Sequence, residues 1–341
     1  DVRLFGVNYH SAFSRYLDDV SDRSFTNGFA YLAEHHIPVA RCGLQEYGPV
    51  GWSLYFSDKE EYFRRLDDFI AQAEHYGVGL HINVLNGIGT LGDLVDDAVA
   101  AGYLTPGVDF TPPDPLNLDM FGTPTYAEYR TALAREDSGT CALIEYVTRE
   151  LVRRYKDSPA IWCWEFANEA SNSVDLPNIN EHRPEETPAL GYLLARDGPE
   201  VPAWTSKDDI TREDVRVAKI HFARAVRAED SWRMICSGDS RPRNAAWHNW
   251  KHHSWTVDAR DEIVQVLPMD SPAPINTQCL HIYPMEDPYF SDDPVSIAWE
   301  TGDYEAYLTF FRDASAQRDR PMIVGEWGAK GDGTGEDERT T

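Results

Sequence analysis

Residues 161–170, IWCWEFANEA, are an apolar run that leads into an amide and a carboxylate, Asn168 and Glu169. The run has the length and composition of a buried strand. Far downstream, residues 322–328, MIVGEWG, repeat the pattern and place Glu326 at the end of a second apolar strand. The carboxyl ends of parallel strands lie at one face of a sheet. We therefore expect Glu169 and Glu326 to face one another.

Working outward from residue 161, we find six further apolar runs that predict strands, at residues 4–9, 39–42, 78–84, 234–237, 278–283 and 322–326. Helical spacing predicts helices that begin near residues 25, 57, 139, 211 and 304. Ser57 and Glu60 have capping-box spacing, and Gly77 is expected to end that helix. Strands that alternate with helices across short links are typical of a parallel sheet.

The long irregular segments come after strands, not before them. They cover residues 86–137, residues 170–210, and a loop rich in Trp and His that carries Trp247 and Trp250. This asymmetry favours an α/β fold, a (β/α)8 TIM barrel with long βα loops, as one catalytic domain over residues 1–341. No eighth strand is visible in residues 330–341. We expect either a C-terminally incomplete chain or closure by a segment that the pattern does not reveal.

Bulk composition narrows the partners. The net charge of −26 argues against nucleic acid or an anionic membrane, and no apolar run of membrane-spanning length occurs. Aromatic residues make up 12% of the chain, which suits a neutral oligosaccharide or polysaccharide substrate. The five Cys fit buried thiols, and no nucleotide motif is present, so we expect no metal and no cofactor.

The chain starts at Asp1, close to its first strand and without an initiating Met. A removed leader or a trimmed sequence would each explain this start. We expect a secreted or periplasmic protein rather than a cytoplasmic one.

Retaining glycoside hydrolysis uses two carboxyl groups about 5–5.5 Å apart, one protonated and one ionised. With 57 Asp and Glu residues, a pair of acids alone proves little, so the argument rests on the strand ends. Burial of a lone charge is unfavourable, so each of the two acids must be functional or paired. Glu165 lies within the strand and is better explained as a paired glutamate of the core.

The Asn168-Glu169 pair, residues 281–283 (His-Ile-Tyr) and Glu326 resemble the retaining glycoside hydrolases of clan A. The closest likeness is to family 5, which holds cellulases and mannanases, and it covers residues 4–328 in the same strand order. This resemblance implies that Glu169 is the acid/base and Glu326 the nucleophile. The same resemblance implies the supporting roles: Asn168 binds the sugar 2-hydroxyl, Tyr283 donates to the nucleophile, Arg41 orients it, and His281 lines the site.

The sequence departs from the family pattern at three places. Leu85 stands where a histidine usually ends the third strand, with Asn83 beside it, and His81 lies earlier in the strand. Ala170 replaces the proline that usually follows Asn-Glu. The tryptophan of the eighth strand has no counterpart before residue 341.

Several further residues are candidates for binding sugar. Trp327 follows the nucleophile, and contact with sugar or packing explains it equally well. Trp247 and Trp250 are expected in a loop above the barrel, although a helical stripe would also explain their spacing. Asp239 follows the fifth strand and either lines the site or caps the next helix. Three nearby histidines, at 248, 252 and 253, have no acidic partner motif and suit a surface cluster better than a metal site.

The leading hypothesis is a retaining glycoside hydrolase that cleaves β-glycosidic bonds of a neutral glycan of β-glucan or β-mannan type. One alternative is an exo-acting clan A β-galactosidase or β-mannosidase, because long loops can wall off a pocket as well as line a cleft. Another is a barrel that only binds carbohydrate, which predicts loss of at least one of the two glutamates. Both Glu169 and Glu326 are present.

Overall fold

The computed structural model describes residues 4–45, 52–88, 91, 93–105, 117–118, 124–125, 133, 135–178, 210–283, 288–292 and 303–328. Its strands are β1 (Gly6–Asn8), β2 (Val39–Gly43), β3 (Gly79–Asn83), β4 (Asn117–Leu118), β5 (Pro124–Thr125), β6 (Ile161–Glu165), β7 (Met234–Cys236), β8 (Gln278–Ile282) and β9 (Met322–Trp327). All seven predicted strands are present. The β4–β5 hairpin was not predicted.

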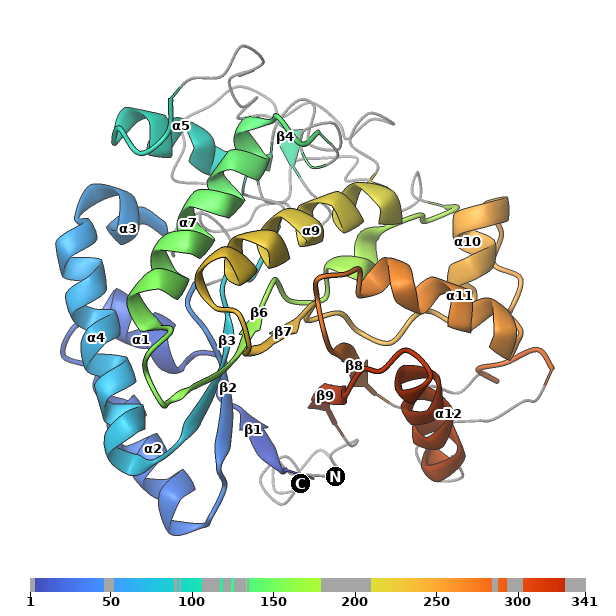
Figure 1. Ribbon diagram of the computed structural model, residues 1–341, viewed down its shortest axis with the longest axis horizontal. Helices are drawn as coiled ribbons and strands as arrows, with labels where there is room; N and C mark the ends of the chain where they lie inside the picture. Colours follow the sequence, from blue (N-terminus) through green and yellow to red (C-terminus); the bar gives the residue numbers. More distant parts are fainter. Residues whose placement is uncertain are drawn as a thin grey trace.

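The described helices alternate with these strands. They are α1 (Ala12–Asp18), α2 (Ser24–Glu34), α3 (Ser53–Ser57), α4 (Lys59–Tyr76), α5 (Asp93–Ala100), α7 (Gly139–Tyr155), α9 (Arg212–Glu229), α10 (Ala246–His252), α11 (Arg260–Asp270) and α12 (Tyr304–Ala316), with the 3-10 helix η2 (Ala170–Ser173). Figure 1 shows the helices on the outside and the strands toward the centre, as in an α/β barrel.

Seven of the described strands form two parallel sheets that follow one another in barrel order, β1-β2-β3-β6-β7 and β8-β9, and β4 and β5 form a separate antiparallel pair. Side chains join the two sheets between β7 and β8. The side-chain oxygen of Asn276 accepts from the backbone N–H of Ile235 at 2.7 Å, and the hydroxyl of Thr277 donates to the Ile235 carbonyl at 2.9 Å. The backbone polar groups of Ile235 are thus satisfied from the segment that leads into β8.

Aromatic side chains attach the first helices to the barrel. The ring of Phe69 in α4 lies 5.2 Å from each of the rings of Phe13, Phe25 and Phe29, centroid to centroid. All four side chains are fully buried, so their packing fixes α1 and α2 against α4. Burying each ring contributes about 1.5–3 kcal/mol relative to leaving it exposed.

Helix α4 begins one residue later than the predicted capping box. Asp58 is its N-cap and accepts from the backbone N–H of Glu61 at 3.0 Å, whereas the Ser57 hydroxyl donates to the carbonyl of Ser53. Aspartate takes this role because its carboxylate accepts from a free N–H beside the positive end of the helix. Gly77 ends the helix as predicted, with a φ of +68° that glycine adopts without strain.

The segment after β7 differs from the prediction. Trp247 and Trp250 lie on helix α10, three residues apart, and not in a loop. Helix α11 was also not expected, and it contains Pro268 near its end. Within residues 86–137, which were predicted as an irregular segment, the structure has helix α5 and the β4–β5 hairpin. Residues 179–209 and 329–341, including the segment searched for an eighth strand, lie outside the described residues.

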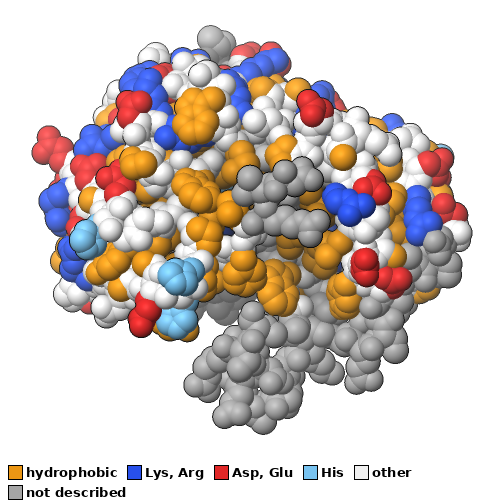
Figure 2. Space-filling model, turned by 60° about the horizontal axis from the view of Figure 1, so that its bottom comes forward, with side chains coloured by type: hydrophobic (Ala, Val, Ile, Leu, Met, Phe, Trp, Pro, Cys, Tyr) orange, Lys and Arg blue, Asp and Glu red, His pale blue; other side chains and the backbone are white. Residues whose placement is uncertain are grey.

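Within the described residues, no strand pairs with the outer edge of β1 or of β9. These two edges carry exposed apolar side chains: Leu4, Phe5, Val324 and Trp327. Figure 2 shows hydrophobic side chains gathered near the centre of the face that it brings forward. None of the described helices is both long and apolar enough to cross a membrane.

Candidate active site

Glu169 and Glu326 lie close together at the ends of β6 and β9. Nδ1 of His281 lies 3.0 Å from Oε1 of Glu169 and 3.4 Å from Oε1 of Glu326. One carboxylate oxygen of each glutamate and a ring nitrogen of His281 all lie within 4.8 Å of one another. One oxygen of each acid thus lies within 4.8 Å of the other, which is compatible with the separation of about 5–5.5 Å between the carboxyl groups of retaining glycoside hydrolases.

Strand register explains how His281 reaches both acids. His281 and Glu326 are paired across β8 and β9, after a shift of register between Leu280 and His281. Such an irregularity re-aims the side chains that follow it. Gly325 leaves room for the imidazole, because a Cβ there would lie 2.8 Å from Nε2 of His281.

Two donors hold the carboxylate of Glu326. Nη1 of Arg41 donates to its Oε1 at 2.7 Å, and the Tyr283 hydroxyl donates to its Oε2 at 2.9 Å. Burial alone would raise the pKa of Glu326, but positive charge on His281 and Arg41 and the hydrogen bond from Tyr283 outweigh it. The net result is a lowered pKa, which keeps the carboxylate ionised as a nucleophile requires.

Arg41 is itself fixed by a buried carboxylate. Its Nη2 donates to Oε1 of Glu165 at 2.6 Å and its Nε to both oxygens, at 3.0 and 3.1 Å. Nη2 also donates to Oδ1 of Asn168 at 2.8 Å. Since that contact uses the carbonyl of Asn168, its amide N–H groups remain to donate elsewhere. One guanidinium thus connects Glu165, Asn168 and Glu326.

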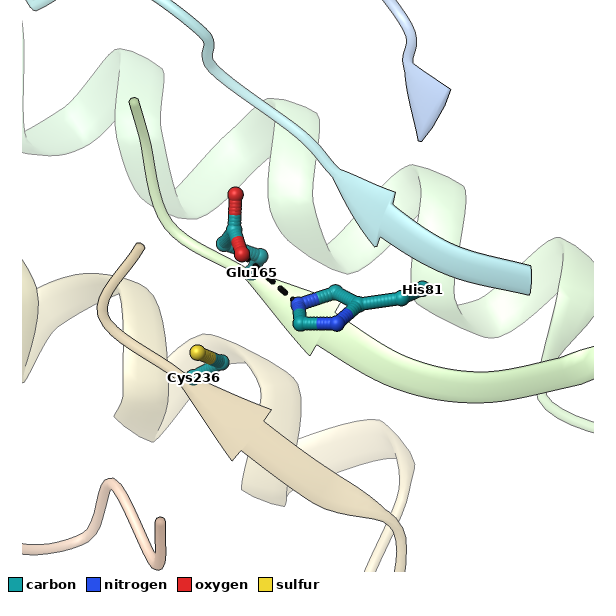
Figure 3. A group of neighbouring side chains, drawn as sticks. All are labelled: His81, Glu165 and Cys236. Atoms are coloured by element: carbon teal, nitrogen blue, oxygen red, sulfur yellow. Dashed lines mark ion pairs between the residues drawn. The ribbon is translucent and has the colours of Figure 1, made fainter. Parts of the chain in front are cut away.

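Glu165 is fully buried and has two further partners. Nε2 of His81 lies 2.7 Å from its Oε2, as Figure 3 shows, and Nδ2 of Asn83 donates to its Oε1 at 2.6 Å. Burial would raise the pKa of Glu165, but the charges of Arg41 and His81 lower it to about 2. The predicted paired glutamate of the core, which ends β6, therefore has partners on two neighbouring strands, β2 and β3.

Glu169 occupies a special backbone position. Its φ of 50° and ψ of 34° are left-handed, a conformation that costs a residue other than glycine about 1–2 kcal/mol. Its backbone N–H donates to the carbonyl of Gly238 at 2.8 Å. Gly238 has a φ of +70°, and a Cβ there would lie 1.9 Å from the carbonyl oxygen of Ala167. Close contact between the ends of β6 and β7 therefore holds Glu169 in place.

The structure brings six of the predicted residues together: Glu169, Glu326, Arg41, Asn168, His281 and Tyr283. Trp327 lies at the end of β9 and is 50% exposed. Trp247 and Trp250 are partly buried on α10, where Trp247 packs with His248 and His252. The roles in sugar binding assigned to these three tryptophans stay predictions.

Two predicted binding residues are turned into the protein. Asn83 is fully buried, with its amide nitrogen on Glu165 and its oxygen accepting from the backbone N–H of Asn86 at 2.8 Å. Asp239 is also fully buried; it forms an ion pair with Lys219 and accepts from the backbone N–H of Ser171 at 3.1 Å. It therefore supports the segment after Glu169 rather than capping the next helix.

Sequence reasoning missed three neighbours of the site. His10 follows β1, and its Nε2 lies 3.0 Å from Oδ1 of Asn86. Asn172 donates from Nδ2 to Oε2 of Glu169 at 2.9 Å, and Ser240 donates to Oδ1 of Asn172 at 2.5 Å. Only Asn172 could have been found from the sequence, because it lies three residues after Glu169 and such a short spacing suggests contact.

Three described groups have side chains of the kind that bind metal ions: His81, Glu165 and Cys236; Glu169, His281 and Glu326; His248, Asp258 and Glu262. In the first, Glu165 is engaged by Arg41 and Asn83. In the third, His248 does have an acidic partner, contrary to expectation, since its Nδ1 lies 2.7 Å from Oδ1 of Asp258. Asp258 also accepts from two backbone N–H groups at the start of α10, which gives it a structural role.

No protein-family model and no curated protein sequence matches the chain. Solved structures do. The glycoside hydrolase family 5 mannosidase of Rhizomucor miehei is 17% identical with a TM-score of 0.54, covering 98% of this chain and 71% of that one. The hyperthermostable endo-1,4-β-D-mannanase of Thermotoga petrophila RKU-1 is 13% identical with a TM-score of 0.56, covering 98% and 81%.

A third similar structure is the exo-β-1,4-mannosidase of Opitutaceae bacterium strain TAV5, which is 14% identical with a TM-score of 0.52 and covers 96% of this chain and 46% of that one. These similarities establish the fold. The chain is a (β/α)8 barrel of the kind found in family 5 glycoside hydrolases.

Proposed function

We propose that the protein is a retaining glycoside hydrolase that cleaves β-glycosidic bonds of a neutral glycan. One observation carries the proposal: two carboxylates within reach of the same imidazole nitrogen differ in their partners. Glu326 has Arg41 and Tyr283 as donors, whereas Glu169 has the amide of Asn172. The cation favours ionisation of Glu326, so the pair divides into a nucleophile and an acid/base.

The reaction would proceed by double displacement. Glu326 attacks the anomeric carbon while Glu169 gives its proton to the glycosidic oxygen. The bond between the anomeric carbon and the glycosidic oxygen breaks, and its electron pair stays on that oxygen. The glycosyl ester formed on Glu326 is then attacked by water, which Glu169 deprotonates. Two inversions at the anomeric carbon leave its configuration unchanged.

The β-mannan class is the first substrate to test, because the structures of similar fold include mannanases and mannosidases. A β-glucan remains the second class. Endo and exo action differ in the loops after β3 and β6, which lie largely outside the described residues. A barrel that only binds carbohydrate is disfavoured by the presence of both carboxylates with their donors.

The experiment is a screen of β-mannan, β-glucan and activated aryl β-mannosides and β-glucosides, with the first-formed anomer followed by NMR. We expect hydrolysis with a β-anomer as the first product. An α-anomer would exclude the double displacement, and binding without hydrolysis would favour the non-catalytic alternative. The size of the products from the polymer separates endo from exo action.

A further inference from the structure

The carboxylate of Glu169 is held at both oxygens by different side chains. Oε1 lies 3.0 Å from Nδ1 of His281, on the side of Glu326. Oε2 accepts from Nδ2 of Asn172 at 2.9 Å. Asn172 lies in η2, which begins at the residue after Glu169, and its backbone N–H donates to the Glu169 carbonyl at 2.9 Å. Side chain and backbone of Asn172 thus both contact Glu169.

The orientation of the Asn172 amide is fixed from two sides. The hydroxyl of Ser240 lies 2.5 Å from Oδ1 of Asn172 and 3.1 Å from the carbonyl of Arg241, and it donates to Oδ1 when Nδ2 faces Glu169. An ionised carboxylate accepts only, which requires the same orientation. Arg243 holds the backbone of this residue, because its Nη2 donates to the Asn172 carbonyl at 2.7 Å. A flipped amide would turn its oxygen toward the ionised carboxylate of Glu169 and lose that hydrogen bond.

We propose that Asn172 is a positioning residue that orients the carboxyl group of Glu169 so that Oε1 gives the catalytic proton. This inference rests on the proposed function. The amide N–H of Asn172 fills one acceptor site of Oε2 and so fixes the plane of the carboxyl group, with Oε1 on the side of His281. The proton is therefore given from Oε1, the oxygen beside His281. From there it passes to the glycosidic oxygen as the bond to the anomeric carbon breaks.

The proposal separates substrates by their leaving groups. A sugar leaving group needs the proton from Glu169, whereas a dinitrophenolate leaves without it. We expect Asn172→Ala to lower kcat on the natural glycan about 10- to 100-fold, part of the range that general acid catalysis supplies. With a dinitrophenyl glycoside, the rate of glycosyl-enzyme formation should change by less than about 3-fold.

The pH profile gives a second readout. A neutral donor at Oε2 favours the ionised carboxylate, so its loss favours the protonated acid. The alkaline limb of kcat/KM should therefore move to higher pH in Asn172→Ala. Asn172→Asp, which places a second carboxylate beside Oε2, should move it further in the same direction. A residue that only supports the fold would lower activity without moving this limb.

Two further variants complete the test. Ser240→Ala frees the Asn172 amide to rotate, so it should show the same dependence on the leaving group with a smaller loss of activity. This variant tests the inference even if Asn172→Ala does not fold. Asn27→Ala removes an exposed asparagine of α2 and should match the wild type. The inference would be overturned if Asn172→Ala or Ser240→Ala lost activity equally on the glycan and on the dinitrophenyl glycoside and left the alkaline limb in place. Wild-type protein without hydrolytic activity would instead overturn the proposed function.

Discussion

Nη1 of Arg41 lies 2.7 Å from Oε1 of Glu326, and the arginine side chain is only 4% exposed. A charge-assisted hydrogen bond shielded from water is stronger than the same contact at the surface. The two residues lie 285 positions apart in the sequence, and Glu165 fixes the guanidinium from the other side. Glu326, the proposed nucleophile, is therefore oriented by an arginine whose guanidinium is fixed on both sides.

Arg41→Lys should lower kcat/KM by about 10²- to 10³-fold, because one ammonium cannot replace the contacts with three partners. Arg41 helps to hold the pKa of Glu326 below its ordinary value through its charge and its hydrogen bond. Lysine keeps a positive charge but is too short to hold it against Glu326, so that pKa should rise. The acid limb of the kcat/KM profile should then move to higher pH. Arg154→Lys, at an exposed ion pair with Asp67, is the control and should leave the profile unchanged. An acid limb that stays in place in Arg41→Lys would contradict this role.

Glu326→Gln should abolish turnover, with a loss of at least about 10⁴-fold, because an amide cannot form the glycosyl ester. The substitution keeps the size of the side chain, so substrate should still bind. Mass spectrometry with a slow 2-fluoro glycoside should detect a covalent adduct on the wild type and none on the variant. An adduct on Glu326→Gln would remove Glu326 from the nucleophile role.

Glu169→Ala should lose most activity on the natural glycan, by about 10³-fold or more, and keep the first step on dinitrophenyl glycosides. Azide should restore turnover of those activated substrates, because a small anion needs no general base. The product would be a β-glycosyl azide, which NMR identifies. Failure to form it, or near wild-type hydrolysis of the glycan, would contradict the acid/base assignment.

The His81–Glu165 pair should make stability depend on pH. Burial lowers the pKa of His81, but Glu165 raises it to about 9, above its ordinary value of 6.5. A raised histidine pKa gives stability that is present below about pH 6.5 and lost as the pH rises through about 9. Glu165, with its pKa near 2, gives stability that is lost only as the pH falls from about 4.5 through about 2.

Urea unfolding of the wild type should therefore weaken from pH 6.5 to 9, by a free energy on the order of 3 kcal/mol for this group. His81→Gln should be less stable at pH 6 and show a flatter alkaline side. His75→Gln, at an exposed position of α4, is the matched control. If the free energy of unfolding depends on pH in the same way in the wild type and in His81→Gln, the pair does not exchange a proton on unfolding.

Sequence patterns sufficed for the strands, because each buried strand of a parallel sheet is an apolar run. They also placed Glu169 and Glu326 at one face, since a strand end has only one position relative to its neighbours. They could not give depth along the barrel axis. Asn83 is paired with Glu165 across β3 and β6, so it lies deeper than Glu169 and Glu326, although it was predicted beside the end of its strand.

The errors in predicting α10 as a loop and in missing α11 have a different cause. Glu262 accepts from the backbone N–H of Ala259 at the start of its own helix α11, whereas the start of α10 is capped by Asp258 from the segment between the two helices. Such a contact depends on how two segments fold together, so neither segment shows it alone. The link from Ser240 through Asn172 to Glu169 is of the same kind, because it joins residues 68 positions apart.

The left-handed backbone of Glu169 implies that the proposed acid/base stands at a position whose backbone conformation glutamate disfavours. Glycine adopts the same φ and ψ without strain. Glu169→Gly should therefore have a free energy of unfolding about 1 kcal/mol higher than that of Glu169→Ala, although both variants lack the acid. Calorimetry of the two inactive variants would measure how much stability the chain gives up to present a carboxylate there, and equal stability would show that the conformation is unstrained.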